Sequence, residues 1–332
     1  SVLQVAAALR CESIVHSCIQ YLEAVPWEYN EEDEILLVVS QLGPPAMPVL
    51  ARTQHVDLVA TKSIFISAIR FATKVDGPCP PFGDELRISA QEQVEYMLGD
   101  DEDMLLVAAD DEVKSETKTG LSKTFSLFES ELSSILGPPD VFEGADDRIM
   151  QCLSDLEWMC GILLKMGLMN DFVSMWIDVS ETVLRIFNDE KLGCVMWGLK
   201  VKLIQVTSKV LDAVGYGNVI LPAPCRVRLL KTWLPFVRNL KPLLDSMTDR
   251  DIEFPYKMDE DLWQSVEGAI VSLVSTLPSD DQANILADWM SADDQLRYPD
   301  LSEAFEVWCF RTKSAKRRLV GGLDRVNTTV SL

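Results

Sequence analysis

The chain has 332 residues, of which 48% are hydrophobic, so it is long and apolar enough to form a buried core and is not disordered throughout. Its 52 acidic residues outnumber its 30 Lys and Arg, and the formal net charge of −22 repels nucleic acids and anionic membrane surfaces. We therefore expect partners that are neither nucleic acids nor membranes.

Residues 1–25 have a helical pattern from the start, and we expect two short helices there. The first carries Val-Leu-x-x-Ala-x-x-Leu over residues 2–9, and the second ends in Cys-x-x-Tyr-Leu over residues 18–22. Both motifs, within the sequence VLQVAAALRCESIVHSCIQYLE of residues 2–23, resemble the last helical hairpin of a BTB/POZ domain. Three further words are similar to those of a plant BTB/POZ family with a large helical C-terminal region: EAVPW at 23–27, LADW at 286–289 and FEVW at 305–308.

The resemblance implies that residues 1–25 are the C-terminal hairpin of a truncated BTB/POZ domain, and that the chain is a piece of a longer polypeptide. In that family the BTB core dimerises and can engage a cullin ubiquitin ligase, while the C-terminal helices recruit a substrate. The strands and first helices of the core are missing from this sequence. The resemblance thus implies that the full-length protein forms a homodimer and contacts a cullin scaffold through the missing core, and that this chain recruits the substrate.

Residues 26–98 are predicted to form a helical, BACK-like segment. Its first helix end is marked by Leu-Gly-Pro-Pro at 42–45, where glycine suits a left-handed cap and proline prevents continuation. The content of Pro and Gly predicts a loop at 77–83, and a short helix is expected over 86–98.

Residues 99–120 are rich in acidic side chains and contain only two lysines. Because runs of like charge repel one another, we expect an acidic flexible linker here, part of it mobile. The acidic residues of this segment are Asp100, Asp101, Glu102, Asp103, Asp110, Asp111, Glu112 and Glu116.

Residues 121–319 are predicted to form a C-terminal helical domain, because apolar residues recur there at steps of three and four. These stripes run over 149–163, 172–186, 195–214, 262–277 and 301–308. Alternating runs typical of strands are absent. The sequence therefore predicts an all-α fold without a substantial sheet, an array of helical hairpins with about a dozen helices, either BACK-like or a degenerate solenoid.

Residues 225–241 contain basic side chains and no acidic one, which is unusual in so acidic a chain. One interpretation is a surface helix whose basic stems cover apolar ground. The other is a binding surface for an acidic or phosphorylated segment, such as residues 100–112 of this chain. The candidate partner-binding residues are Arg226, Arg228, Lys231, Trp233, Arg238 and Lys241. Pro235 among them predicts a kink or a helix boundary.

A second basic cluster follows the last apolar stripe, and it suggests either a nuclear-localisation signal or residues that complement a helix C-terminus. Its members are Arg311, Lys313, Lys316, Arg317 and Arg318. Residues 320–332 are weakly patterned, and we expect a loosely held tail.

Residues for metal or covalent chemistry are scarce: the chain has two histidines, His16 and His55, and eight scattered cysteines without a C-x-x-C pair. The cysteines read as reduced core residues: Cys11, Cys18, Cys79, Cys152, Cys160, Cys194, Cys225 and Cys309. No nucleotide-binding glycine loop, serine-hydrolase elbow or zinc-protease motif occurs. We therefore predict a protein without catalytic activity, metal or cofactor.

From these patterns we expect a cytoplasmic or nuclear protein-interaction module. The resemblance makes it the substrate-recruiting region of a BTB-type adaptor for a cullin-RING E3 ubiquitin ligase. The alternative is a nuclear transcriptional cofactor or scaffold without a role in ubiquitination. The sequence does not identify the substrate or partner.

Overall fold

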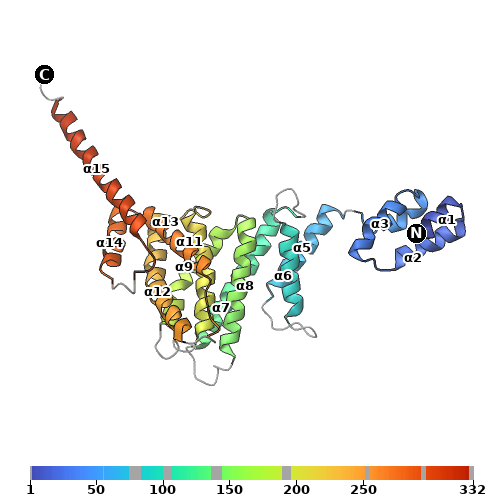
Figure 1. Cartoon of the computed structure of the whole chain (residues 1–332), viewed down its shortest axis with the longest axis horizontal. Helices are drawn as coiled ribbons and strands as arrows, with labels where there is room; N and C mark the ends of the chain where they lie inside the picture. Colours follow the sequence, from blue (N-terminus) through green and yellow to red (C-terminus); the bar gives the residue numbers. More distant parts are fainter. Residues whose placement is uncertain are drawn as a thin grey trace. The chain divides into compact units, whose positions relative to one another are not determined.

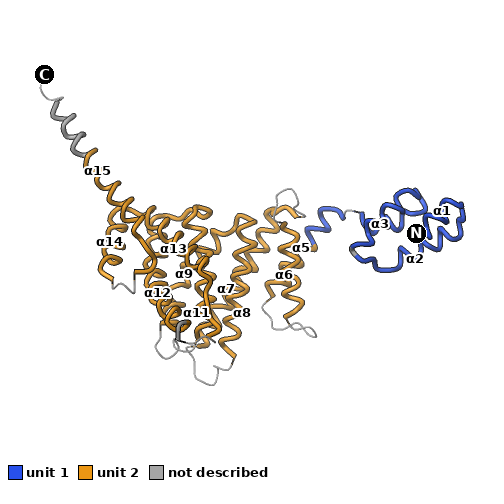
Figure 2. Tube along the Cα trace, viewed as in Figure 1, with its two compact units in different colours: residues 1–63 blue, residues 64–332 orange. Residues whose placement is uncertain are grey.

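The computed structural model describes residues 2–54, 56–74, 84–99, 107–135, 144–188, 196–250, 254–292 and 297–328. These ranges contain 14 α-helices, one 3-10 helix and no strand, which confirms the predicted all-α fold. The chain divides into two compact units, residues 1–63 and residues 64–332, shown in different colours in Figure 2. This division differs from the predicted boundaries after residues 25 and 98.

The first unit contains four short α-helices and the 3-10 helix. They are α1 (Val2–Ala8), α2 (Glu12–Ala24), α3 (Tyr29–Val39), η1 (Pro44–Ala46) and α4 (Met47–Leu50). Their shared core is small and consists of Leu3, Ile19, Val39, Ala46 and Val49. Gly43 precedes η1 with a φ of 68°, a value that favours glycine, but it is not the predicted left-handed cap, because α3 ends at Val39 and Ser40 is its C-cap.

The boundary between the units lies within α5 (Leu58–Ala72). The second unit continues with α6 (Glu85–Leu98), α7 (Asp111–Ile135), α8 (Ala145–Lys165), α9 (Met169–Phe187), α11 (Trp197–Gly215), α12 (Ala223–Arg250), α13 (Glu260–Ser275), α14 (Ser279–Met290) and α15 (Ser302–Thr328). Within this unit the helices lie side by side: α8 packs between α7 and α11, and α11 packs in turn on α13 (Figure 1).

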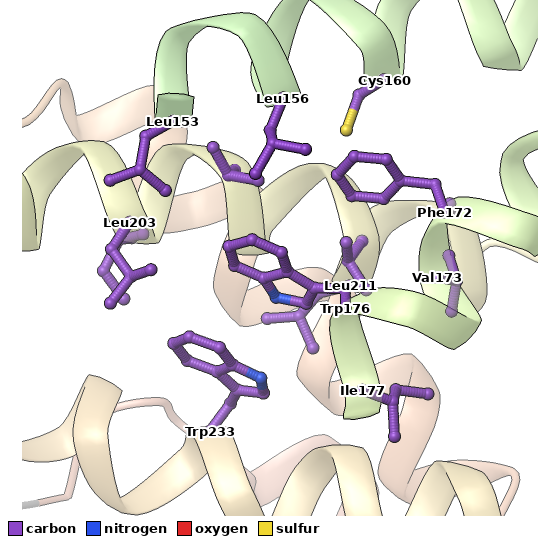
Figure 3. Close-up of a cluster of buried hydrophobic side chains, with 14 of the residues drawn as sticks. Leu153, Leu156, Cys160, Phe172, Val173, Trp176, Ile177, Leu203, Leu211 and Trp233 are labelled. Atoms are coloured by element: carbon purple, nitrogen blue, oxygen red, sulfur yellow. The ribbon is translucent and has the colours of Figure 1, made fainter. Parts of the chain in front are cut away.

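The predicted apolar stripes form one continuous core in this second unit. The stripe of α8 is fully buried through Ile149, Leu153, Leu156, Cys160 and Leu163. The stripe of α9 is equally buried, and its Trp176 lies among side chains from α8, α11 and α12 (Figure 3). Burial of these stripes against one another is the main stabilising contribution to the fold.

The predicted linker at 99–120 is wrong for residues 111–120, which form the first turns of α7. Asp110 caps this helix by accepting hydrogen bonds from the backbone nitrogens of Glu112 and Val113 at 3.1 and 3.0 Å. The acidic residues therefore sit at a helix N-terminus, where the helix dipole favours negative charge. Residues 100–106 lie outside the described part of the chain.

Two other expectations differ from the structure. Helix α12 continues through Pro235 as well as Pro242, so neither proline is a helix boundary. Helix α15 continues to Thr328, so the basic cluster at 311–318 is not at a helix C-terminus and the tail is helical to that residue. These basic residues therefore do not complement the dipole at a helix C-terminus.

Candidate interaction surfaces

An open apolar groove lies in the first unit and is lined by residues of α1, α2 and α3. Its volume is about 730 Å³. Tyr21 and Leu37 line it and are 66% and 64% exposed, values that are high for side chains of this size and apolarity. The other lining residues are Leu3, Gln4, Ser13, Ile14, Ser17, Cys18, Leu22, Glu34, Ile35 and Val38.

The groove is held in shape by Arg52, which follows α4 and reaches the end of α2. Its guanidinium donates to the carbonyl oxygens of Leu22 and Val25 at 2.6 and 2.8 Å. The same group lies 4.0 Å from the ring centroid of Trp27, whose Nε1 also donates to Leu22. These contacts satisfy carbonyls that the C-terminus of α2 leaves unpaired, so this end of the groove wall is fixed.

Sequence reasoning missed this groove, although α2 carries a signal for it. Val15, Ile19 and Leu22 face the small core, while Ile14 and Tyr21, one heptad apart, remain exposed. A helix that is apolar on two faces has a second surface to cover.

The basic residues of α12 are brought together with acidic side chains of neighbouring helices. Arg228 lies 3.2 Å from Asp178 and 3.3 Å from Glu181, both on α9. Lys231 lies 3.6 Å from Asp281 on α14. The predicted basic surface is therefore partly neutralised within the fold.

Lys241 extends this line of basic residues. Its ammonium lies 3.2 Å from Asp245 and 5.4 Å from the ring centroids of both Trp263 and Tyr298. Burial and nearby acidic residues raise the pKa of the Tyr298 hydroxyl, which donates to the carbonyl oxygen of Trp263 at 2.6 Å. Lys241 thus covers an aromatic pair as well as carrying charge.

Arg226 and Arg238 differ from the other basic residues of α12. Among the described residues, the buried Nε of Arg226 and the buried Nε and Nη2 of Arg238 have no hydrogen-bond partner. Desolvation by burial lowers the pKa of Arg238, and the carboxylate of Asp288 opposes this effect. These two guanidiniums have hydrogen-bonding capacity that the fold does not use.

Trp233 is not part of a surface. Its side chain is fully buried, stacks on Trp176 with ring centroids 5.8 Å apart, and donates from Nε1 to Ser180 Oγ at 2.9 Å (Figure 3). A side chain without exposed area cannot contact a partner directly, so the prediction that Trp233 binds a partner is wrong.

The second basic cluster lies on α15. Arg311 donates from Nη1 to the carbonyl oxygen of Ser275, whereas Lys313, Lys316, Arg317 and Arg318 are exposed. A cluster of exposed basic residues on one helix suits a nuclear-localisation signal or a protein contact.

Asp155 is a titratable residue whose contacts are structural. In a polar pocket of about 250 Å³, the Asp155 carboxylate pairs with Arg87 and accepts hydrogen bonds from Gln91 and Gln151 at 3.0 and 3.2 Å. Such a carboxylate links α6 to α8 and has little capacity left for proton transfer. In the described ranges no cluster of His, Cys, Asp and Glu suits a metal ion.

The described cysteines are free, but fewer are core residues than predicted. Cys152 and Cys160 are buried, whereas Cys11, Cys18 and Cys225 are half-buried and Cys309 is exposed. Burial raises the pKa of the Cys152 thiol to about 12, which disfavours the reactive thiolate. Cys79, Cys194 and His55 lie outside the described residues, and His16 is exposed on α2.

No helix in the described ranges combines the length and apolarity required for a membrane span.

The sequence is similar to known proteins. The BTB/POZ ankyrin-like repeat family matches residues 140–315, which lie in the second unit. No solved structure matches the chain.

Three relatives are BTB/POZ domain-containing proteins of Arabidopsis thaliana. One is 46% identical over 331 residues, which are 97% of this chain and 74% of the relative. A second is 24% identical over 319 residues and a third is 26% identical over 320 residues. These matches cover 93% and 94% of this chain but only 59% and 56% of the two relatives. The chain belongs to the plant family of BTB/POZ domain-containing proteins, whose members are protein-interaction modules.

Proposed function

We propose that the chain is the substrate-recruiting region of a BTB-type adaptor for a cullin-RING E3 ubiquitin ligase. The observation that carries the proposal is the apolar groove of the first unit, which leaves Tyr21 and Leu37 exposed on a segment similar to the end of a BTB domain. Exposed apolar grooves commonly bind a segment of another protein. In our proposal the first unit belongs to the ligase side and the second unit binds the substrate.

The occupant that we propose for the groove is the BTB core of the longer protein, through which that protein dimerises and contacts the cullin. The relatives support this proposal because each is longer than the region that matches this chain. The groove is also neutral along most of its length, with Glu34 as its one charged lining residue, so it suits an apolar domain face.

The test compares Tyr21→Glu and Leu37→Glu in the longer protein and in this 332-residue chain. In the longer protein each substitution buries a carboxylate, so we expect lower thermal stability and weaker cullin capture. In this chain the positions are exposed and stability should not change. Tyr96→Glu on α6, where the tyrosine is 74% exposed, is the matched control. If Tyr21→Glu and Leu37→Glu behave like this control in the longer protein, the groove is not covered by its core.

On the substrate side we propose the side of α12 that carries Arg228, Lys231, Arg238 and Lys241. It is supported by the exposed ion pairs of Arg228 and Lys231, which cost little to rearrange. An acidic or phosphorylated segment would accept hydrogen bonds from the exposed side chains of Arg228 and Lys231.

The second candidate function is a nuclear cofactor or scaffold without a role in ubiquitination. It is favoured by the exposed basic residues Lys313, Lys316, Arg317 and Arg318 of α15. Replacing Lys316, Arg317 and Arg318 with Ala should move the full-length protein from the nucleus to the cytoplasm if they form an import signal. Nuclear retention of this variant, together with cullin capture, would favour the ligase role.

A further inference from the structure

The outward face of α15 has an unusual order of side chains. Leu301 and Ala304 are buried, and Phe305 and Trp308 are half-buried where the helix packs on α13 and α14. On the opposite side of the helix five exposed residues follow one another at intervals of three, four, three and four, so they share one face. These are Glu303, Glu306, Phe310, Lys313 and Arg317.

This outward face is not used by the rest of the described chain. Phe310 is 73% exposed, which makes it one of the most exposed aromatic side chains described. Within the described ranges no hydrogen bond or ion pair engages the side chains of Glu303, Glu306, Lys313 or Arg317. Figure 1 shows α15 extending beyond the helices on which its first turns pack. The acidic and basic halves are therefore both available to a partner.

The charges on this face are complementary to those on a second copy of the same helix that runs in the opposite direction. Glu303 lies seven residues before Phe310 and Arg317 lies seven residues after it; Glu306 lies four residues before and Lys313 three residues after. In an antiparallel pair of these helices that crosses at Phe310, each acidic residue faces a basic residue of the other copy. In a parallel pair, like charges would face each other.

We propose that the outward face of α15 is a two-fold contact between two copies of this chain, with Phe310 on the axis. Residue pairs related by a two-fold axis occur twice, so Glu303 with Arg317 and Glu306 with Lys313 give four interchain ion pairs around one aromatic pair. The steps of three and four residues are those of a coiled-coil seam, so one face of the helix can stay turned toward its partner over these two heptads.

The charge order favours this occupant over others. A uniformly acidic segment or a nucleic acid would meet Glu303 and Glu306 as well as the bases, and the net charge of −22 adds to that repulsion. Helix polarity favours Glu303 in the first turn of α15, but it does not account for the basic residues, because the helix continues to Thr328 and they are not in its last turn.

The contact is expected to be weak and sensitive to salt. The face spans about 21 Å from Glu303 to Arg317 at the usual helical rise. Two helices in contact over this length bury less than the roughly 1,200 Å² of a standard stable interface. Exposed ion pairs are screened at high ionic strength, so self-association should weaken as salt is raised.

The proposal can be tested by exchanging the charges on this face and measuring self-association of the whole 332-residue chain by sedimentation velocity at low salt. Lys313→Glu with Arg317→Glu makes the face acidic throughout, and Glu303→Lys with Glu306→Lys makes it basic throughout. Each double variant alone should self-associate at least about tenfold more weakly than the unaltered chain. An equimolar mixture of the two should associate at least as well as the unaltered chain, and the chain with all four substitutions should recover self-association.

The matched control is Lys316→Glu with Arg318→Glu, which changes the net charge equally at exposed positions beside the face. It should change self-association less than twofold. The proposal is overturned if the mixture associates no better than its components, or if the control weakens association as much as the substitutions on the face. A circular-dichroism melt of each variant establishes that it is folded.

A cross-link locates the axis independently. In a Cys309→Ser background, Phe310→Cys should form a disulfide-linked dimer under mild oxidation, because residue 310 faces its own copy. Lys316→Cys in the same background should remain monomeric. Equal cross-linking of the two positions would contradict a contact at Phe310.

Discussion

Trp233 of α12 stacks on Trp176 of α9 with an interplanar angle of 10°, and its indole nitrogen donates to Ser180 one helical turn from Trp176. This contact anchors α12 to the centre of the second unit, as Figure 3 shows for both indoles. It fixes the rotation of α12 about its axis and therefore which of its basic residues face outward. The buried tryptophan positions the candidate surface without belonging to it.

Trp233→Ala should therefore destabilise the second unit and not act only on binding. We expect a loss of about 3–5 kcal/mol in the free energy of unfolding, because a fully buried aromatic side chain leaves a large cavity. Trp233→Phe, which keeps a ring but loses the N–H, should cost less. Urea unfolding measures both, and an unchanged midpoint for Trp233→Ala would contradict the buried position.

Two sets of substitutions test whether the basic residues of α12 bind a partner. Changing Arg228 and Lys231 to Glu should weaken capture of partners by the intact protein, while folding is retained because the ion pairs of both residues are exposed. Changing Asp178 and Glu181 to Ser should strengthen capture, since Arg228 is released from its acidic neighbours. Unchanged affinity for every captured partner in both variants would discard this surface.

Gly120 lets α7 approach the end of α5. A Cβ at this position would lie 2.8 Å from Oγ1 and 2.9 Å from Cγ2 of Thr73, closer than van der Waals contact allows. Gly120→Ala should therefore destabilise the protein by about 1–3 kcal/mol, and Thr73→Ala should restore part of the loss.

Gly161→Ala on α8 is the control for this prediction, since nothing lies within 4 Å of its Cβ position. It should be neutral or stabilising, because alanine has the higher helix propensity. Equal effects of the two glycine substitutions in thermal unfolding would show that Thr73 does not restrict residue 120.

The pair of Arg70 and Glu116 makes stability depend on pH. Arg70 donates to the Glu116 carboxylate at 2.8 Å, and this hydrogen bond lowers the pKa of Glu116 below its ordinary value. In the unfolded chain the pKa of a glutamate is about 4.3, and in the folded protein the pKa of Glu116 is lower. The pair therefore contributes its full stabilisation above the unfolded pKa. This contribution is lost as the pH falls through the folded pKa.

Arg70→Gln should therefore lose stability less steeply than the unaltered chain between about pH 4.5 and pH 3. Arg185→Gln, at an exposed position on α9, should keep the original slope. Urea midpoints measured across this pH range give both slopes, and parallel curves for Arg70→Gln and the unaltered chain would refute the contribution of the pair.

The sequence predicts the fold well where burial alone decides the structure. The stripe from Ile149 to Leu163 has helical spacing, and each of its members is buried on α8 as expected. Prediction failed at residues 111–120, because their acidic residues suggested repulsion. The spacing of Val113 and Thr117 together with the cap at Asp110 gives the correct interpretation.

The candidate site could be predicted only in part, because ion pairs between helices depend on tertiary packing. Arg228 was recognisable as a member of a basic stretch, but its partners Asp178 and Glu181 are 50 and 47 residues away in the sequence. Trp233 lies between those bases in the sequence, and only the packing of α12 on α9 separates it from them. The groove beside Tyr21 was missed because it requires α3 as its second wall.

The central claim is that this chain recruits a substrate while the longer protein also engages a cullin. Affinity purification of both forms from plant cells, followed by quantitative mass spectrometry, tests it most directly. We predict that the longer protein captures a cullin together with further partners, and that the 332-residue chain keeps those partners and loses the cullin. Failure of the longer protein to capture any cullin would contradict the ligase role.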